Sequence, residues 1–318
     1  MITIPYSTVD NAIAYYKDDI QMHIIALSES LNHLLRYGKL KPDQKKYAQY
    51  LADNHKKIVL ARPAEFNKYA KMFARYIKPN VMGSDSYKNF RNKLLDALGY
   101  ENKRTNFYPK YFTKIGIKAC AYCNSQSTVT IEAVTEKGRK RKAKFQVDHY
   151  FPKSEYPCFS ISLYNLYPVC ASCNNSKGKR KVDFVLYGNP ATMGVSSVFK
   201  FKLDLTSVAK YILERKDDTI RYTFEAPAPK KGTVSYDKVF DIQGIYDTQR
   251  DIAEELVLKA SIYTKSYKKI LKNKFPEIFT SPEIIDRLLI GNYTSESDIH
   301  KRPMAKFTSD IAKQVGLI

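Results

Sequence analysis

The N-terminal third of the chain places apolar side chains at the spacing of amphipathic helices. Over residues 7–37 they recur at steps of three or four, which predicts one helix that ends at Gly38. Ser7 and Asp10 are expected to cap its start. The apolar positions are Ile13, Tyr16, Ile20, Ile24, Leu27, Leu31 and Leu34. Further helices are predicted over residues 42–55, 63–77 and 86–98, so residues 1–106 should form a helical N-terminal region.

After Tyr108 the pattern changes to short β-prone segments. Residues 127–134 and 143–148 are expected to pair as a hairpin, joined by the charged loop EKGRKRK. A segment rich in Gly, Asn, Pro and Ser at 187–197 indicates a boundary. Strands are predicted beyond it at 198–205 and 220–225, and helices at 248–274 and 282–290. The expected fold is α+β, with a central region at 107–190 and a mixed, mainly helical C-terminal region at 191–318.

The charge of the chain favours a polyanionic partner. Lys and Arg number 53 against 32 Asp and Glu, a formal net charge of +21, and the resulting field makes nucleic acid the leading expected partner. An anionic membrane is the competing partner, but it requires a basic amphipathic anchor or a lipidation site, and neither is evident. No apolar run is long enough for a membrane span and no secretory signal is apparent, so the expected location is cytoplasmic.

The cysteines fall into two C-x2-C pairs, Cys120 with Cys123 and Cys170 with Cys173, and one further residue, Cys158. Two such pairs commonly assemble a tetrahedral zinc site, with four reduced, buried thiols as the alternative. A shell of four thiolates leaves no open coordination position. We therefore expect a structural zinc ion at this site, and we expect Cys158 to be buried apart from it.

Asp148 and His149 stand side by side between the two cysteine pairs, at the end of a short apolar run. Taken alone, an adjacent Asp-His pair usually belongs to a solvated turn. Phosphodiester hydrolysis, however, needs a positioned base and a cation. A neutral imidazole such as His149 accepts a proton from water near neutral pH, and the Asp148 carboxylate can hold a divalent ion.

The segments CAYC (120–123), VDHYFPK (147–153) and YNLYPVCASCNNSKGK (164–179) resemble the HNH, or ββα-metal, nucleases of the zinc-stapled, four-cysteine type. The resemblance covers residues 119–180 and implies a treble-clef-like core. It assigns the general base to His149 and gives Asn165 the task of bridging the loop by backbone hydrogen bonds. Asn174 stands where the family has its last His or Asn. With the pattern H-N-N, the ligands of the ion would be a carboxylate oxygen of Asp148 and an amide oxygen of Asn174. Mg²⁺ or Mn²⁺ is therefore expected as the catalytic ion.

Basic residues on both sides of this motif are expected to grip a nucleic-acid backbone, the alternative being exposed, solvated side chains. These residues are Lys153, Lys177, Arg139, Lys140, Arg141, Lys142, Lys179 and Arg180. A later basic run at 265–274 either extends this nucleic-acid-binding surface or forms the solvent-exposed face of a helix.

Three functions are compatible with the sequence. The leading one is a metal-dependent HNH endonuclease that cuts DNA, with RNA as an alternative substrate. The segments AYCN, DHYFPKSEYP and FDIQGIYDTQRDIAEELVLKASIY resemble the defence-associated, PtuB-like (Septu-type) branch of the HNH nucleases. This resemblance implies a role in anti-phage defence and an ATPase partner of the ABC or AAA type. A sequence-specific restriction or homing endonuclease is the second, although no reading module is apparent. The third is a protein that has the four-cysteine zinc site and binds nucleic acid without cutting it. Binding alone does not require Asp148, His149 and Asn174 together, which speaks against this function.

Overall fold

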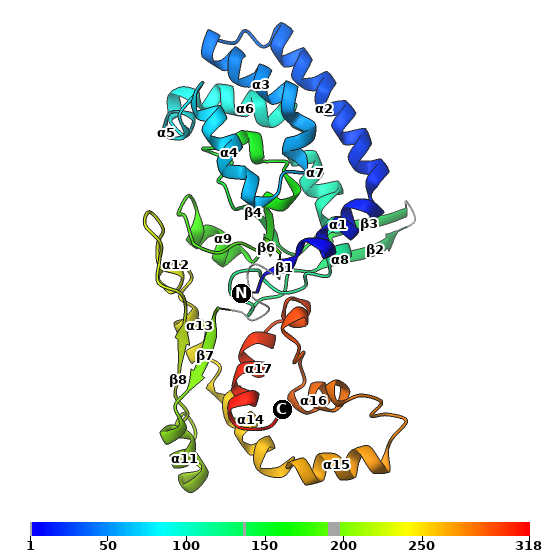
Figure 1. The fold of residues 1–318 in the computed structure, drawn as a ribbon, viewed down its shortest axis with the longest axis vertical. Coiled ribbons are helices and arrows are strands. Elements are labelled where there is room, and N and C mark those ends of the chain that lie inside the picture. The colour runs from blue at the N-terminus through cyan, green and yellow to red at the C-terminus, as the bar shows by residue number, and fades with distance from the viewer. Residues whose placement is uncertain (1, 136–137, 190–197) are drawn as a thin grey trace.

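The structure, a computed structural model, describes residues 2–135, 138–189 and 198–318, without the side chains of residues 135–140. It is a mixed α+β protein in which helices dominate and the described strands form small, two-stranded sheets. Figure 1 shows the N-terminal helices at one end, the central strands with α9 in the middle, and α14 to α17 at the other end.

Eight helices precede the central strands. They are α1 (Tyr6–Tyr15), α2 (Lys17–Tyr37), α3 (Pro42–Val59), α4 (Pro63–Ala74), α5 (Pro79–Met82), α6 (Lys88–Ala97), α7 (Tyr100–Asn106) and α8 (Tyr108–Ile115). Proline opens α3, α4 and α5, where its fixed φ suits the first turn and its missing N–H costs no bond. The predicted helical character of this region is confirmed.

The single helix predicted over residues 7–37 is wrong in one respect, because Tyr16 divides it into α1 and α2. At Tyr16 φ is −103° and ψ is 28°, outside the helical range. The predicted caps are also wrong, since α1 starts after Pro5 without a side-chain cap. Asp10 instead accepts hydrogen bonds from Arg62 and Tyr164. The predicted end at Gly38 is confirmed.

The central strands pair differently from the prediction. Strand β2 (Thr130–Thr135) pairs antiparallel with β3 (Gly138–Ala143), so most of the charged segment is itself a strand. Strand β4 (Gln146–His149) pairs instead with β5 (Leu166–Val169), which leads directly to α9 (Ala171–Lys177). The predicted hairpin is therefore wrong. The exposed charges of Arg141 and Lys142 break the alternation of apolar and polar positions that would predict β3. The ion pair of Arg141 with Glu132 supports the pairing of β2 with β3.

The remaining elements continue from β6 (Tyr187–Gly188), which pairs in parallel with β1 (Ile4–Pro5) near the N-terminus. They are β7 (Lys200–Leu203), α11 (Leu205–Glu214), β8 (Tyr222–Glu225), α12 (Tyr236–Phe240), α13 (Ile242–Asp247), α14 (Arg250–Ile262), α15 (Lys265–Lys274), α16 (Pro282–Ile290) and α17 (Ala305–Gln314). Strands β7 and β8 lie within the predicted ranges. The helix predicted over 248–274 is divided, because the Thr264 side chain caps a new start at α15.

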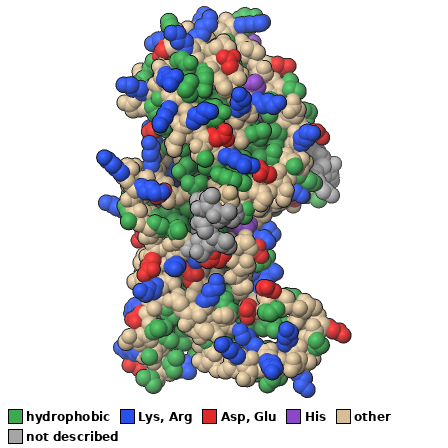
Figure 2. Space-filling view, viewed as in Figure 1, with side chains coloured by type: hydrophobic (Ala, Val, Ile, Leu, Met, Phe, Trp, Pro, Cys, Tyr) green, Lys and Arg blue, Asp and Glu red, His purple; other side chains and the backbone are tan. Residues whose placement is uncertain are grey.

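The division into regions 1–106, 107–190 and 191–318 stays a prediction. Buried side chains from all three parts, among them Leu27, Tyr167 and Phe307, belong to one continuous hydrophobic core. Most of the boundary predicted at 187–197 lies outside the described residues. Within the described ranges, none of the helices combines the length and hydrophobicity needed to cross a membrane. Lys and Arg side chains are spread over the face seen in Figure 2.

The fold makes stability depend on pH through His23, which lies in α2 beside a small cavity also lined by Asp19 and Lys103. Burial, and then the charge of Lys103, lower the pKa of His23 to about 4. As pH falls from about 6.5 towards 4, the unfolded chain binds a proton that the folded chain does not. Wild type should lose up to about 3 kcal/mol of stability through this group. Urea unfolding across this pH range measures the effect. The free energy of unfolding of His23→Gln should fall less steeply with decreasing pH than that of wild type. Equal slopes for the two proteins would contradict the assignment.

Candidate active site and four-cysteine cluster

The four cysteines of the two C-x2-C pairs meet in one cluster. Cys120 and Cys123 follow α8, Cys170 precedes α9 and Cys173 lies within it; their sulfur atoms all lie within 4.8 Å of one another. The Cys170 N–H donates to the Cys120 sulfur over 3.3 Å, and the Cys173 N–H to the Cys170 sulfur over 3.4 Å. This arrangement can hold a metal ion and is compatible with structural zinc. Cys158 is buried outside the cluster, as expected.

The cluster favours a thiolate at Cys123. Side-chain hydrogen bonds from the other three cysteines, with a further one from Ser125, lower the pKa of its thiol. The thiolate is the form that binds metal, so Cys123 is the readiest of the four ligands, whereas the pKa values of the Cys120 and Cys173 thiols are raised by burial and by hydrogen bonds within the cluster. The described residues contain no second group of three or more His, Cys, Asp or Glu side chains close enough to hold one.

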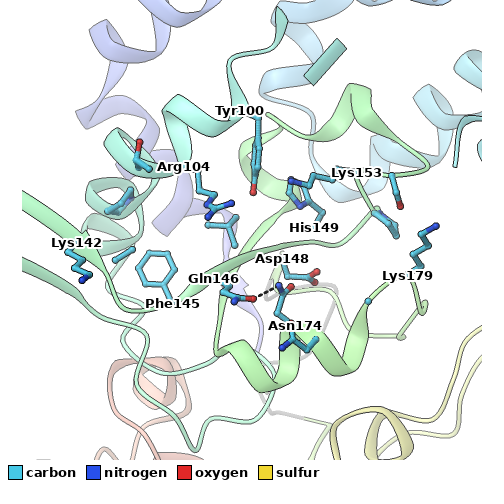
Figure 3. A pocket seen from close by; sticks show the side chains of 18 of the residues that line it. Tyr100, Arg104, Lys142, Phe145, Gln146, Asp148, His149, Lys153, Asn174 and Lys179 are labelled. Carbon is cyan, nitrogen blue, oxygen red and sulfur yellow. Dashed lines mark hydrogen bonds between the residues drawn. The ribbon is translucent and has the colours of Figure 1, made fainter. Parts of the chain in front are cut away.

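A cleft of about 760 Å³ opens beside this cluster, between α7, the segment from β3 to β4, and α9. Five cationic side chains and a single carboxylate line it, so the cleft is electropositive. Figure 3 shows its principal side chains: Tyr100, Arg104, Lys142, Phe145, Gln146, Asp148, His149, Lys153, Asn174 and Lys179. The cationic ones are Arg104, Arg141, Lys142, Lys153 and Lys179.

Asp148 is held from two directions. The Tyr122 hydroxyl donates to its Oδ2 over 2.6 Å. The Lys177 ammonium lies 3.0 Å from Oδ2 and 3.3 Å from Oδ1, and it donates to the His149 carbonyl over 2.9 Å. Lys177 is only 2% exposed. The prediction that Lys177 contacts phosphate is therefore wrong: the side chain turns inward from α9 and neutralises a buried carboxylate, which is the compensation that such a charge needs.

His149 lines the same cleft next to Asp148. Its Nε2 lies 3.3 Å from the Ser160 carbonyl oxygen; since a carbonyl only accepts, Nε2 carries the proton and Nδ1 keeps its lone pair. The ring lies 5.0 Å from that of Tyr100. Burial lowers the pKa of His149 to about 3, with the charges of Lys153 and Lys177 adding to the effect. The imidazole is consequently neutral at pH 7, the form that a general base needs, and its lowered pKa makes it a weaker base than a free imidazole.

The two asparagines take different places. Asn165 is fully buried: its side chain accepts from the Phe151 N–H over 2.7 Å and donates to the Phe159 carbonyl over 3.0 Å. This is the loop bridge that the resemblance implies, formed directly beyond His149. Asn174 reaches the cleft from α9, where its amide nitrogen donates to the Gln146 side chain over 2.5 Å. Its amide oxygen has no hydrogen-bond partner among the described residues.

The predicted basic residues divide into four groups. Arg141, Lys142, Lys153 and Lys179 line the cleft, as a backbone-binding role requires. Arg180 lies outside its lining and donates to the Ser176 carbonyl. The structure does not describe the side chains of Arg139 and Lys140. Lys177, as described above, is buried.

Sequence reasoning missed four side chains that shape the site. Tyr100 and Arg104 come from α7 and line the cleft, and Phe145 lines it from the segment before β4. Tyr122, which holds Asp148, stands between two cysteines of the cluster, and this position was the one available signal for it. Tyr100 and Arg104 belong to no motif, so only folding brings them to the site.

Comparison with known proteins gave no match to a family model, to a curated protein or to a solved structure.

Removing the metal tests the cysteine cluster. The purified protein should contain about one zinc ion per chain by mass spectrometry, and Cys173→Ser should lose it and unfold about 10 °C lower, since the ion links two segments of the chain. Cys158→Ala is the matched control, because it removes a buried thiol outside the cluster and should keep the zinc. Equal zinc content in the Cys173 variant and wild type would refute the assignment.

The buried pair of Asp148 and Lys177 generates a stability prediction. Lys177→Met leaves a buried carboxylate with a single hydrogen-bond donor, and should lower the free energy of unfolding by about 3–5 kcal/mol. Adding Asp148→Asn should recover much of this loss, which a double-mutant cycle in urea measures. Lys179→Met, on an exposed lysine nearby, should change stability by less than about 0.5 kcal/mol. Additive effects of the two substitutions would show that the pair is not coupled.

Proposed function

We propose that this protein is an HNH-type nuclease that hydrolyses nucleic-acid phosphodiester bonds in the cleft. The observation that carries the proposal is the imidazole of His149, neutral at pH 7, placed beside Asp148 and Asn174 in a cleft whose charged side chains are mostly cationic. The order of elements supports it. Strands β4 and β5 pair, α9 follows, and the cysteine cluster joins this unit to the chain before it. DNA is the proposed substrate and RNA the alternative.

The residues present fit a weakly held divalent ion. Asp148 and Asn174 lie on the same side of the cleft in Figure 3 and can offer one carboxylate and one amide oxygen. The Lys177 ammonium already neutralises the carboxylate, so water and phosphate oxygens would have to complete the shell, as Mg²⁺ tolerates. Such an ion supplies positive charge for the oxygens of the scissile phosphate.

The side chains of the chain divide the remaining work. His149 accepts a proton from a water molecule, whose oxygen bonds to phosphorus while the bond from phosphorus to the 3′ oxygen breaks and that oxygen takes a proton from solvent. Asn165 keeps His149 in place by closing the loop behind it. Lys142, Lys153 and Lys179 attract the backbone and stabilise the charge of the phosphate. Lys177 and Tyr122 fix the Asp148 carboxylate.

A role in anti-phage defence with an ATPase partner is a further part of the proposal, supported by the sequence words that resemble the Septu-type branch. It is tested by copurification of the natively expressed protein, where recovery of an ATPase of the ABC or AAA type supports it. Recovery of the chain without any ATPase contradicts it.

Nuclease activity is tested with supercoiled plasmid and with labelled RNA, each in Mg²⁺, Mn²⁺ or EDTA. Wild type should nick plasmid, and His149→Ala should lower the rate by about 10²- to 10⁴-fold, since a positioned base contributes that much. His33→Ala, on an exposed histidine of α2, is the matched control and should keep full activity. Cleavage by the His149 variant at the wild-type rate would contradict the proposal. A defined fragment pattern would favour the restriction or homing enzyme. Binding without cutting in either metal would favour the non-catalytic protein.

A further inference from the structure

An ion-pair bridge lies at the rim of the cleft and joins two residues of α7, outside the HNH-like segments, to the last residue of the segment VDHYFPK. One oxygen of the Glu101 carboxylate lies 3.1 Å from an Arg104 guanidinium nitrogen, and the other lies 3.7 Å from the Lys153 ammonium. Glu101 and Arg104 come from α7, whereas Lys153 follows His149 in the loop after β4. One carboxylate thus holds two cations, one from its own helix and one from the loop after β4.

The bridge lies where two hollows meet. Arg104 and Lys153 line the cleft, while Glu101 lines a neighbouring hollow of about 640 Å³ beside the C-terminal end of α6. Tyr100 and Lys153 line both. A strand that runs from the cleft into the second hollow along these shared residues would pass the bridge.

The bridge is also close to the proposed base. The Lys153 ammonium lies over the Tyr100 ring, 4.3 Å from its centroid, and that ring lies 5.0 Å from the His149 ring. Figure 3 shows Tyr100 between Arg104 on one side and His149 and Lys153 on the other. An anion held between Arg104 and Lys153 would therefore lie next to the reacting phosphate.

The energetics favour exchange of the Glu101 carboxylate for a phosphate. The Glu101 side chain is 67% exposed, and ion pairs this exposed contribute little to stability, typically about 0–1 kcal/mol. A phosphodiester presents two oxygens to the two cations in the same way, and release of counterions from the nucleic acid adds free energy that an internal carboxylate cannot supply. Arg and Lys can bind either group, so the carboxylate competes with substrate.

We propose that Arg104 and Lys153 form a phosphate clamp for the nucleic-acid backbone next to the scissile bond, and that Glu101 occupies this clamp until substrate displaces it. The inference rests on the proposed function in taking nucleic acid as the ligand. It adds a binding site from the N-terminal helices and a competing carboxylate that lowers affinity in the free protein.

The test measures binding rather than cleavage, so it separates this proposal from the nuclease proposal. All variants carry His149→Ala and are titrated in EDTA against fluorescent DNA and RNA oligonucleotides, with anisotropy read at several salt concentrations. Arg104→Gln should weaken binding roughly 5- to 10-fold and reduce the salt slope by about 1. Glu101→Gln should tighten binding roughly 3- to 10-fold, because it frees both cations. DNA and RNA should respond alike, since the clamp contacts phosphate.

Matched controls separate the clamp from a general effect of charge. Glu29→Gln and Lys45→Gln make the same charge changes on exposed positions of α2 and α3. Equal effects of Glu101→Gln and Glu29→Gln, or of Arg104→Gln and Lys45→Gln, would overturn the clamp. Clamp-dependent binding by a wild-type protein that does not cut would keep the clamp and reject the nuclease, whereas absence of binding at low salt would reject both.

Discussion

The structure depends on one constraint, the cluster of four cysteines that joins the loop after α8 to the start of α9. Between these two points the chain forms the β2–β3 hairpin, β4, the long loop closed by Asn165, and β5. A metal ion held by the four sulfur atoms would link the ends of this segment and remove much of its freedom in the unfolded state. The Tyr236 and Tyr246 hydroxyls donate to backbone carbonyls of Tyr122 and Cys123, so the C-terminal helices are tied to the same point.

The cluster is also connected to the proposed catalytic centre through side chains. Tyr122, between its first two cysteines, and Lys177, one turn after Asn174, both bind Asp148. The carboxylate is therefore placed by the two segments that the cysteines bring together. Because Lys177 balances its charge, the centre is close to neutral inside an electropositive cleft. Under the proposed function, a phosphate would be drawn mainly by the surrounding cations, and a divalent ion would find few protein ligands of its own.

The proposed active site has a wall that the nuclease-like segments do not supply. Helix α7 brings Tyr100 and Arg104 against His149 and Lys153. The N-terminal helices therefore contribute to the cleft itself, in addition to any part they have in docking. Under the proposed function, α7 would help to determine which backbone enters the cleft and how tightly it is held.

The sequence by itself determined the features that rest on local spacing: the two C-x2-C pairs, the end of α2 at Gly38, the helical N-terminal region and the adjacency of Asp148 and His149. Only the tertiary structure decided which strands pair, because the apolar β5 offers β4 a buried partner that proximity along the chain did not reveal. It also decided the fate of Lys177, since the direction of a long side chain depends on where its counter-charge lies. Arg104 and Tyr100 carry no motif, and their place at the cleft follows from the packing of α7 against distant residues.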